Sequence, residues 1–242
     1  MENEKRYPGD ELAVSVHDKR GVILLSGGID SAVGVELAMR NGWELAALTI
    51  DYGQRHSSEL IAARKIAAEY KLEHVVAKID VANLLPSPLT TLKKPEADPD
   101  DPERSEFYVP GRNTIFLSLA LGFAEARGIQ SIFIGATLED HIAFRDCREI
   151  FLSMFEKAAQ FGTGKKIRVR APLLKMRKLD VVRCGIETGA PLHLTVSCYY
   201  ADGETHCGKC PACEIRRQAF ADLAKERPGT EDPTEYGGEG GN

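Results

Sequence analysis

Long apolar runs are missing from this chain of 242 residues, and none approaches the roughly 20 residues that a membrane helix needs. A basic excess is missing as well, because 31 lysines and arginines stand against 36 acidic residues. The resulting net charge of −5 argues against a protein that coats nucleic acid. The first letters, MENEKRYPGDE, contain no apolar core of a secretory signal. We therefore expect a cytoplasmic protein that binds neither a membrane nor, directly, a nucleic acid.

Cysteines are scarce, six in all, which is too few for a disulfide scaffold in a chain of this length. Cys147 and Cys184 stand alone, whereas four others lie within sixteen residues: Cys198, Cys207, Cys210 and Cys213. In a reducing compartment such crowding favours a metal site over disulfides. Four thiolates suit tetrahedral zinc, with an iron–sulfur cluster as the second alternative. His206 adjoins this cluster, and we interpret it as a bystander.

Short apolar runs alternate with segments of helical period, which indicates a parallel sheet covered by helices on both faces. Strands are expected at 22–25, 45–50, 74–79, 131–135 and 168–173, and helices at 32–39, 57–71, 113–127, 148–160 and 178–188. The prediction is a doubly wound α/β domain over 20–190 followed by a C-terminal helical, four-cysteine zinc-binding segment over 191–226. The termini, 1–19 and 227–242, are expected to be flexible.

Two segments do not fit a packed core. Residues 86–106 contain five prolines and six acidic residues, which is typical of a mobile lid or a solvated linker, and the linker is the favoured alternative. Residues 227–242 contain five glycines and four acidic residues and predict a poorly ordered tail. No apolar stripe in the sequence identifies an interface between copies of the chain.

The motif Ser-Gly-Gly-Ile-Asp-Ser at 26–31 lies between the first expected strand and the first expected helix. Ligands of open α/β sheets bind at this edge, and glycines let the backbone approach an anion at the start of a helix. The motif lacks the Gly-Lys-Ser/Thr of a Walker A loop and the spaced glycines of a dinucleotide fold. A plain turn with Asp30 as helix cap is the alternative, but the position between strand and helix favours nucleotide binding.

This motif resembles the PP-loop of the ATP pyrophosphatases, a HUP-like fold, and nearly the whole chain resembles the QueC family of 7-cyano-7-deazaguanine synthases. The matching stretches are SGGIDS (26–31), DYGQRH (51–56), VPGRNTIFLSLA (109–120), DCRE (146–149) and SCY…CGKCPAC (197–213). The resemblance implies conversion of 7-carboxy-7-deazaguanine and ammonia to 7-cyano-7-deazaguanine (preQ0) through an adenylate and an amide. ATP with Mg²⁺ is the implied cosubstrate, Zn²⁺ on the four cysteines the implied structural metal, and a homodimer a possible assembly.

The resemblance also implies where the site residues lie. ATP binding is expected at Leu25, Ser26, Gly27, Gly28, Asp30 and Ser31. Catalytic roles are expected for Asp30, Ser31, Lys178 and Arg112. Substrate contacts are expected from Tyr52, Gln54, Arg55, His56, Arg112, Asn113, Asp140, Asp146 and Arg148. For Arg55, His56 and Lys178, a solvated surface position is the structural alternative.

A deazaguanine carries N–H donors at N1 and at its 2-amino group, so its site needs a carboxylate acceptor. Asp140, Asp146 and Glu139 follow the fourth expected strand and are the candidates, with a pairing to Arg148 as the alternative. Asn113 is expected to cap the helix that follows Gly111-Arg112.

One loop departs from the family pattern Asp-Tyr/Phe-Ser-Gly-Tyr-Pro-Asp-Cys-Arg. The Ser-Gly pair is replaced by Ile142-Ala143, and the proline by Arg145. Some QueC-like relatives in antiphage defence systems join the activated deazaguanine to a protein amine, and the altered loop keeps this second function open. The sequence also leaves open whether AMP or ADP is released. A nucleotide sensor or tRNA-binding module is the third alternative, disfavoured by the acidic balance.

Overall fold

The computed structural model describes residues 19–237, except 56, 83, 97, 99 and 101–104. Its described part contains a five-stranded sheet in which all neighbours run parallel, in the order β3-β2-β1-β4-β5. The strands are β1 (Arg20–Leu24), β2 (Glu44–Asp51), β3 (Glu73–Lys78), β4 (Ser131–Phe133) and β5 (Arg168–Arg170). The chain therefore winds outward in both directions from β1, and such sheets bind ligands where the direction changes. The doubly wound prediction is confirmed.

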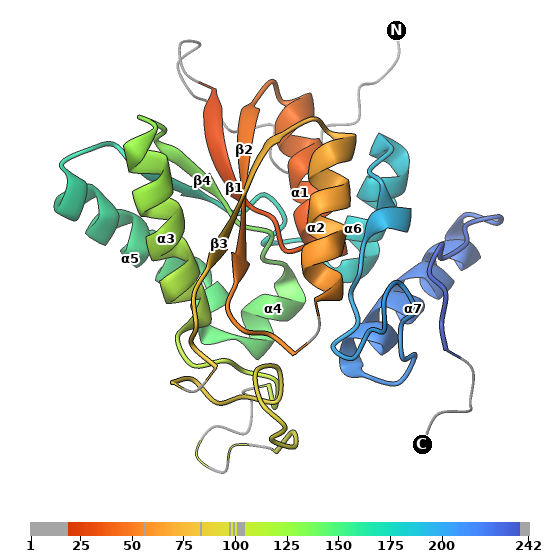
Figure 1. Cartoon of the computed structure of the whole chain (residues 1–242). Helices are drawn as coiled ribbons and strands as arrows, with labels where there is room; N and C mark the ends of the chain where they lie inside the picture. The colour runs from red at the N-terminus through yellow and green to blue at the C-terminus, as the bar shows by residue number, and fades with distance from the viewer. Residues whose placement is uncertain are drawn as a thin grey trace, which may run out of the picture.

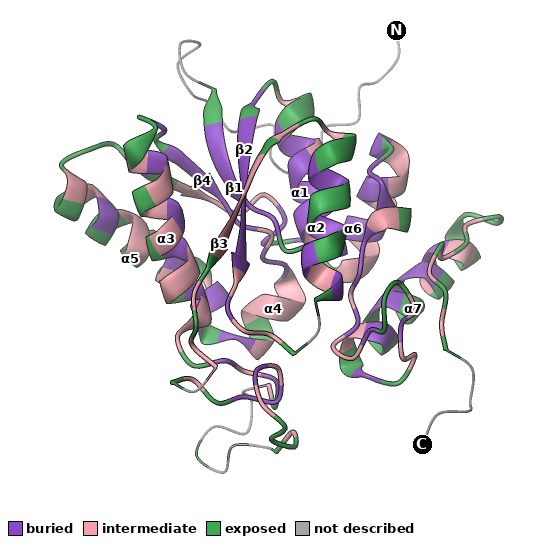
Figure 2. Cartoon of the chain, viewed as in Figure 1, coloured by how far each residue is buried: buried purple, intermediate pink, exposed green. Residues whose placement is uncertain are grey.

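Two layers of helices cover the sheet (Figure 1). One layer holds α1 (Ile29–Arg40), α2 (Ser58–Glu69) and α6 (Lys178–Thr188), and the other holds α3 (Arg112–Ala126) and α5 (Glu149–Thr163). The central strand β1 contributes to both cores. Val22 and Leu24 pack in the cluster with α3 and α5, whereas Ile23 and Leu25 pack in the cluster with α1 and α2. Figure 2 shows the central strands buried, as a sheet covered on both faces requires.

Two short helices occupy a region that the sequence predicts as a loop: α4 (Leu138–Ala143) and η1 (Arg145–Cys147). Thr137 begins α4 with a capping box, because its side chain accepts the N–H of Asp140 while Asp140 Oδ2 accepts the N–H of Thr137 at 3.0 Å. This reciprocal pairing satisfies donors at the helix start. Ala143 has no positive φ, so the loss of the family's glycine there costs no backbone strain.

The C-terminal segment packs on the layer of α1 and α6. It contains η2 (Leu192–Leu194) and α7 (Pro211–Glu226), and Phe220 and Leu223 of α7 join a core cluster with Val181 and Val182 of α6. Pro211 at the first turn of α7 starts the helix without losing a needed hydrogen bond. This apolar cluster attaches the cysteine segment to the sheet domain.

Residues 227–237 differ from the flexible tail that their composition predicts. Asp232 forms an ion pair with Arg216 at 3.1 Å, and the Arg216 side chain is only 1% exposed. Tyr236 donates its hydroxyl to Asp232 at 2.6 Å, and its ring packs against His206. Glycine and acidic residues suggested solvent exposure, but a buried arginine on α7 needs a carboxylate partner. The first eighteen and last five residues lie outside the described residues.

The segment after β3 is anchored at one end. Ser87 and Thr90 are buried and hydrogen-bond to each other, with the Ser87 N–H donating to Thr90 Oγ1 at 3.0 Å. The carbonyl of Leu89 accepts the N–H of Arg55 at 3.0 Å. Residues 87–90 are therefore packed structure rather than a solvated linker.

The surface of α5 carries apolar side chains that the sequence did not single out. Ile150 is 63% exposed, Met154 50% and Phe161 90%. Among the described residues, no helix combines the length and the apolar character that crossing a membrane would require.

Candidate active site

The SGGIDS motif forms a tight loop between β1 and α1. Gly27 has a φ of +90°, and a Cβ there would collide with the backbone of Glu59 and Ala63, so a side chain cannot be accommodated. Ser26 Oγ accepts the N–H of Gly28 at 3.3 Å and donates to Ser31 Oγ at 3.1 Å. No side chain caps α1, and its first N–H groups are therefore available to an anion.

Lys178 and Asp30 meet beside this loop. The Lys178 Nζ lies 2.6 Å from both carboxylate oxygens of Asp30. Burial alone lowers the pKa of Lys178, but the carboxylates of Asp30 and Asp140 outweigh it and raise that pKa. The amine therefore stays protonated at neutral pH. Burial raises the pKa of Asp30, against the opposing effect of Lys178.

Glu139 holds the start of α6 in place. Its Oε1 accepts the N–H of Lys178 at 2.8 Å, while its Oε2 is buried with no hydrogen-bond partner among the described residues. A carboxylate at a helix start is favoured by the helix dipole. The contact fixes the backbone position from which the Lys178 side chain reaches the loop.

A cavity of about 270 Å³ opens at this edge of the sheet. The ends of β1 and β2, the starts of α1, α2, α3 and α6, and the C-terminal segment all contribute to its wall. Predicted site residues in the wall are Leu25, Ser26, Gly28, Asp30, Tyr52, Gln54, Arg112, Asp140 and Lys178. Polar groups thus converge on an apolar-floored cleft, which is typical of a small-molecule site.

Arg112 and Tyr52 supply further polar groups to the cavity wall. Arg112 and Tyr52 interact electrostatically, and the Tyr52 ring packs on Phe116 with centroids 5.3 Å apart. Burial raises the pKa of Tyr52, with Arg112 opposing the rise. Gln54 shapes the strand end by accepting the N–H of Tyr52 at 2.9 Å. Arg112 is therefore held facing the cavity as a fixed cation.

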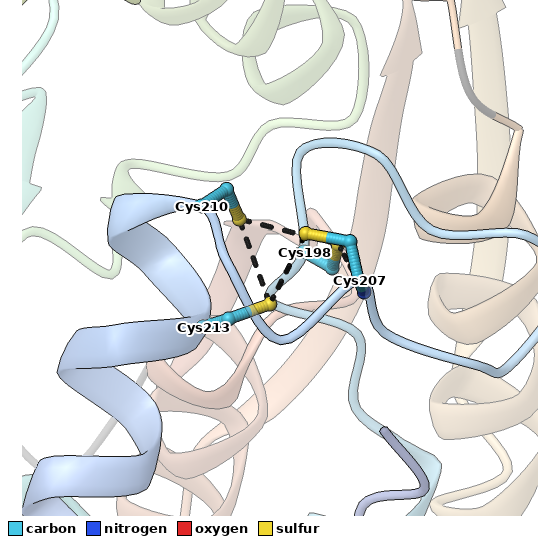
Figure 3. A group of neighbouring side chains, drawn as sticks. All are labelled: Cys198, Cys207, Cys210 and Cys213. Atoms are coloured by element: carbon cyan, nitrogen blue, oxygen red, sulfur yellow. Dashed lines mark hydrogen bonds between the residues drawn. The ribbon is translucent and has the colours of Figure 1, made fainter. Parts of the chain in front are cut away.

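The four clustered cysteines come together in space (Figure 3). Their sulfur atoms all lie within 4.8 Å of one another, with Cys210 Sγ 3.5 Å from Cys213 Sγ and 4.0 Å from Cys198 Sγ. Four sulfurs that share a tetrahedral zinc ion are about 3.8 Å apart. Backbone N–H groups also point at the sulfurs, because Cys198 Sγ accepts those of Tyr200 and Cys207 at 3.2 Å. The group can hold one metal ion.

The cysteine segment is hydrogen-bonded to the SGGIDS loop. The N–H of Val196, two residues before Cys198, donates to the carbonyl of Gly27 at 2.9 Å. Tyr199, directly after Cys198, lines the cavity and packs on Phe107 with ring centroids 4.6 Å apart. The segment that carries the four cysteines therefore shapes one wall of the cavity.

The comparison with protein families decides the identity of this arrangement. The family described as "Queuosine biosynthesis protein QueC" matches residues 20–224. The chain belongs to the QueC family. The 7-cyano-7-deazaguanine synthase of Methylococcus capsulatus is 42% identical over 227 residues, covering 90% of this chain and 99% of the relative. The synthase of Azotobacter vinelandii is 41% identical over 231 residues, covering 92% and 100%.

Solved structures with a similar fold were also found. NMN synthetase from Francisella tularensis is 18% identical with a TM-score of 0.46, covering 74% of this chain and 65% of that one. The U34-tRNA thiolase NcsA from Methanococcus maripaludis is 18% identical with a TM-score of 0.48, covering 87% and 68%.

Several site residues predicted for this QueC family member lie outside the cavity wall: Gly27, Ser31, Arg55, Asn113, Asp146 and Arg148. Gly27 and Ser31 shape the loop from behind, since Ser31 Oγ donates to the carbonyl of Gly28 at 2.9 Å. Arg148 donates its Nε to the carbonyl of His141 at 3.2 Å rather than to an acid. His56 lies outside the described residues.

The expected cap of α3 is wrong. Gly111, with a φ of +62°, is the N-cap, and Asn113 lies inside the first turn, where its N–H donates to Asp146 Oδ2 at 3.1 Å. The Asn113 amide donates to Cys147 Sγ at 3.1 Å. A helix start needs an acceptor, and Asp146 supplies it from a distant part of the chain. Burial raises the pKa of the Cys147 thiol, which makes it a poor nucleophile.

Glu59 and Tyr199 are titratable cavity residues that the sequence did not single out. Glu59 lies in the first turn of α2, three positions after DYGQRH, where it resembles an ordinary helix-start acid. Burial raises the pKa of its carboxyl to about 7, although Arg112 opposes the rise. The available sequence signal was the position of each residue, Glu59 shortly after DYGQRH and Tyr199 within SCY.

Proposed function

We propose that this QueC family member converts 7-carboxy-7-deazaguanine and ammonia to 7-cyano-7-deazaguanine at the expense of ATP, in the cytoplasm. The observation that carries the proposal is a single cavity that joins an anion-binding loop and a protonated lysine to a second polar end. One end suits phosphates and the other suits a polar base. The substrate carboxylate would lie between them, next to the α-phosphate.

The residues support adenylate formation as follows. N–H groups at the start of α1 and the Lys178 ammonium bind the phosphates. A carboxylate oxygen of the substrate attacks the α-phosphorus, and the bond from that phosphorus to the bridging oxygen breaks and releases pyrophosphate. Lys178 stabilises the charge that develops on the departing oxygens. Mg²⁺ would neutralise phosphate charge, and Asp30 and Glu139 are the nearby carboxylates that would hold it.

The amide and nitrile steps follow from the same geometry. Ammonia attacks the acyl carbon, loses a proton and displaces AMP to give the amide. A second ATP adenylates the amide oxygen, and loss of AMP with the remaining N–H proton leaves the nitrile. AMP, rather than ADP, is therefore the expected nucleotide product. Arg112 holds the base in place through both steps.

A structural zinc ion on Cys198, Cys207, Cys210 and Cys213 is part of the proposal. The sulfur spacing suits one shared ion. An iron–sulfur cluster, in which the cysteines bind different irons, requires more widely separated sulfurs. The four ligands close the coordination shell, so the ion stabilises the segment that carries Tyr199 and supplies no reaction step.

The test is incubation of the metal-loaded protein with ATP and 7-carboxy-7-deazaguanine, with and without ammonium, followed by mass spectrometry. We expect nitrile and AMP with ammonium present. Lys178→Ala is expected to slow AMP release by about 100-fold or more, since it removes a preorganised charge. Lys157→Ala, on the exposed face of α5, is the matched control. Absence of AMP formation by the wild-type protein would refute the proposal.

A protein amine as the acceptor is the second candidate function. Ile142 in the loop that departs from the family pattern is 63% exposed, and it lies two residues from Asp140 in the cavity wall. Such a surface is available to a macromolecular nucleophile. An amide that stays attached to an added protein, in the assay above, would support this function over the nitrile.

A second copy of the chain is the partner proposed for the exposed α5 surface of Ile150, Met154 and Phe161. Analytical sedimentation would detect the resulting dimer.

A further inference from the structure

Four carboxylates line the cavity: Asp30, Glu59, Glu139 and Asp140. Three of them already have partners. Asp30 binds the Lys178 amine through both oxygens, and Glu139 accepts the Lys178 N–H. Asp140 uses its Oδ2 twice, accepting the N–H of Thr137 at 3.0 Å and its hydroxyl at 2.8 Å. Each of these three is thus held by at least one hydrogen bond within the chain, although Glu139 Oε2 accepts none among the described residues.

Glu59 differs from the other three. In the described part of the chain its carboxylate has no hydrogen-bond donor, and Arg112 acts on it only through charge. Its backbone is fixed, because α2 begins at Ser58 and the Glu59 carbonyl packs against Gly27. The side chain is therefore positioned by a rigid helix with both oxygens available. A carboxylate that lines the cavity and accepts no hydrogen bond from the chain is available to a ligand that brings its own donors.

The neighbours of Glu59 define what that ligand looks like. Arg112, Tyr52 and Tyr199 line the same cavity as Glu59, and the charge of Glu59 affects the pKa of each. Arg112 is a donor beside an acceptor, and the two tyrosines supply aromatic walls for a planar ring. A guanine-like edge presents a carbonyl oxygen, then an N–H, then an amino group. An arginine next to a carboxylate is complementary to this order.

We propose that Glu59 is the specificity residue that accepts hydrogen bonds from the ring N–H and the exocyclic amino group of the deazaguanine. This inference rests on the proposed function and names the residue that selects its substrate. Arg112 then donates to the adjacent ring carbonyl, and the 7-carboxylate points toward the phosphate loop. Asp140 and Asp146, the acceptors expected from the sequence, are occupied by Thr137 and Asn113.

A pH dependence follows from the position of Glu59. Burial raises the pKa of its carboxyl to about 7, and the charged or titratable groups that face it are Arg112, Tyr52 and Tyr199. Only the ionised carboxylate offers two acceptors to two N–H donors. Substrate KM is therefore expected to rise as the pH falls below about 7, while the affinity for ATP stays level.

The deciding experiment compares 7-carboxy-7-deazaguanine with the analogue that lacks the 2-amino group. Wild-type protein is expected to favour the natural base strongly, because loss of a donor leaves a charged acceptor unpaired. Glu59→Gln is expected to raise KM for the natural base by about 10- to 100-fold, to lose the preference between the two bases, and to bind ATP as before. Glu69→Gln, at the exposed end of the same helix, is the matched control.

The outcomes separate this inference from the function on which it rests. If wild-type protein forms no AMP with either base, the proposed function fails. If wild-type protein is active and Glu59→Gln keeps both its base preference and its KM, the inference about Glu59 is wrong. A loss of kcat alone would also overturn it, because that pattern indicates proton transfer rather than recognition. Should Glu59→Gln not fold, the substrate KM of the wild-type protein is measured between pH 5.5 and 8.5. A KM that does not change over this range would refute the role of Glu59.

Discussion

The buried arginine on α7 offers a quantitative test of how the C-terminal segment is held together. Arg216 donates Nη1 to Thr195 Oγ1 at 2.8 Å and Nη2 to the carbonyl of Leu192 at 3.2 Å, and its Nε pairs with Asp232 at 3.1 Å. Asp232→Asn keeps an oxygen at this position but removes the compensating charge. The guanidinium retains its other acceptors, so the loss is smaller than for a fully orphaned charge.

We expect Asp232→Asn to lower the free energy of unfolding by about 2 kcal/mol, within the range for hydrogen bonds to charged groups. Arg216→Met is expected to cost about 3–5 kcal/mol, because it removes every bond at once and leaves buried acceptors unpaired. Urea unfolding measures both values. Asp222→Asn is the control, since Asp222 pairs with Lys225 on the exposed side of the same helix, and its midpoint should not move. A midpoint for Asp232→Asn equal to that of the wild type would refute the view that residues 227–237 are structural.

Three further predictions concern the site. Gly27→Ala should abolish ATP binding in a nucleotide-binding titration, because a Cβ meets backbone at a positive φ, whereas Gly162→Ala, with open space around it, should have no effect on binding. Elemental analysis should find one zinc ion per chain, and Cys210→Ser should lose it together with ATP turnover; full turnover without metal would contradict the wall-shaping role. Without ligand, the folded protein holds the Glu59 proton more tightly than the unfolded chain does, so stability should fall as the pH rises from about 4.5 past 7; Glu59→Gln should flatten this slope in melting experiments.

Local sequence patterns predicted the sheet well and its surroundings less well. The aliphatic run 45–50 corresponds to β2 (Glu44–Asp51), and the SGGIDS loop has the expected position between β1 and α1. In contrast, α4 was missed because its six residues are too few to show a helical period. The capping box of Thr137 and Asp140 stabilises this helix instead.

The partners of charged side chains were also beyond local prediction. Charge usually indicates exposure, yet Arg216 is among the most buried side chains of the described structure. Asp146 was expected to face substrate, but its carboxylate accepts the N–H of Asn113 at the start of α3, more than thirty residues away in sequence. Glu59 matters only because α2 and α3 bring it next to Arg112. Tertiary contacts of this kind leave no periodic signal in the chain.

We expect the hydrogen bond from Val196 to Gly27 to make the binding of a metal ion by the four cysteines and the binding of ATP by the SGGIDS loop depend on each other thermodynamically. An ion that stabilises the cysteine segment would then also stabilise the loop proposed to bind the triphosphate, and the reverse would hold to the same extent. A chelator should therefore strip the ion more slowly from protein saturated with nucleotide. In cells short of the metal, we expect the affinity of this enzyme for ATP to fall before the sheet loses stability.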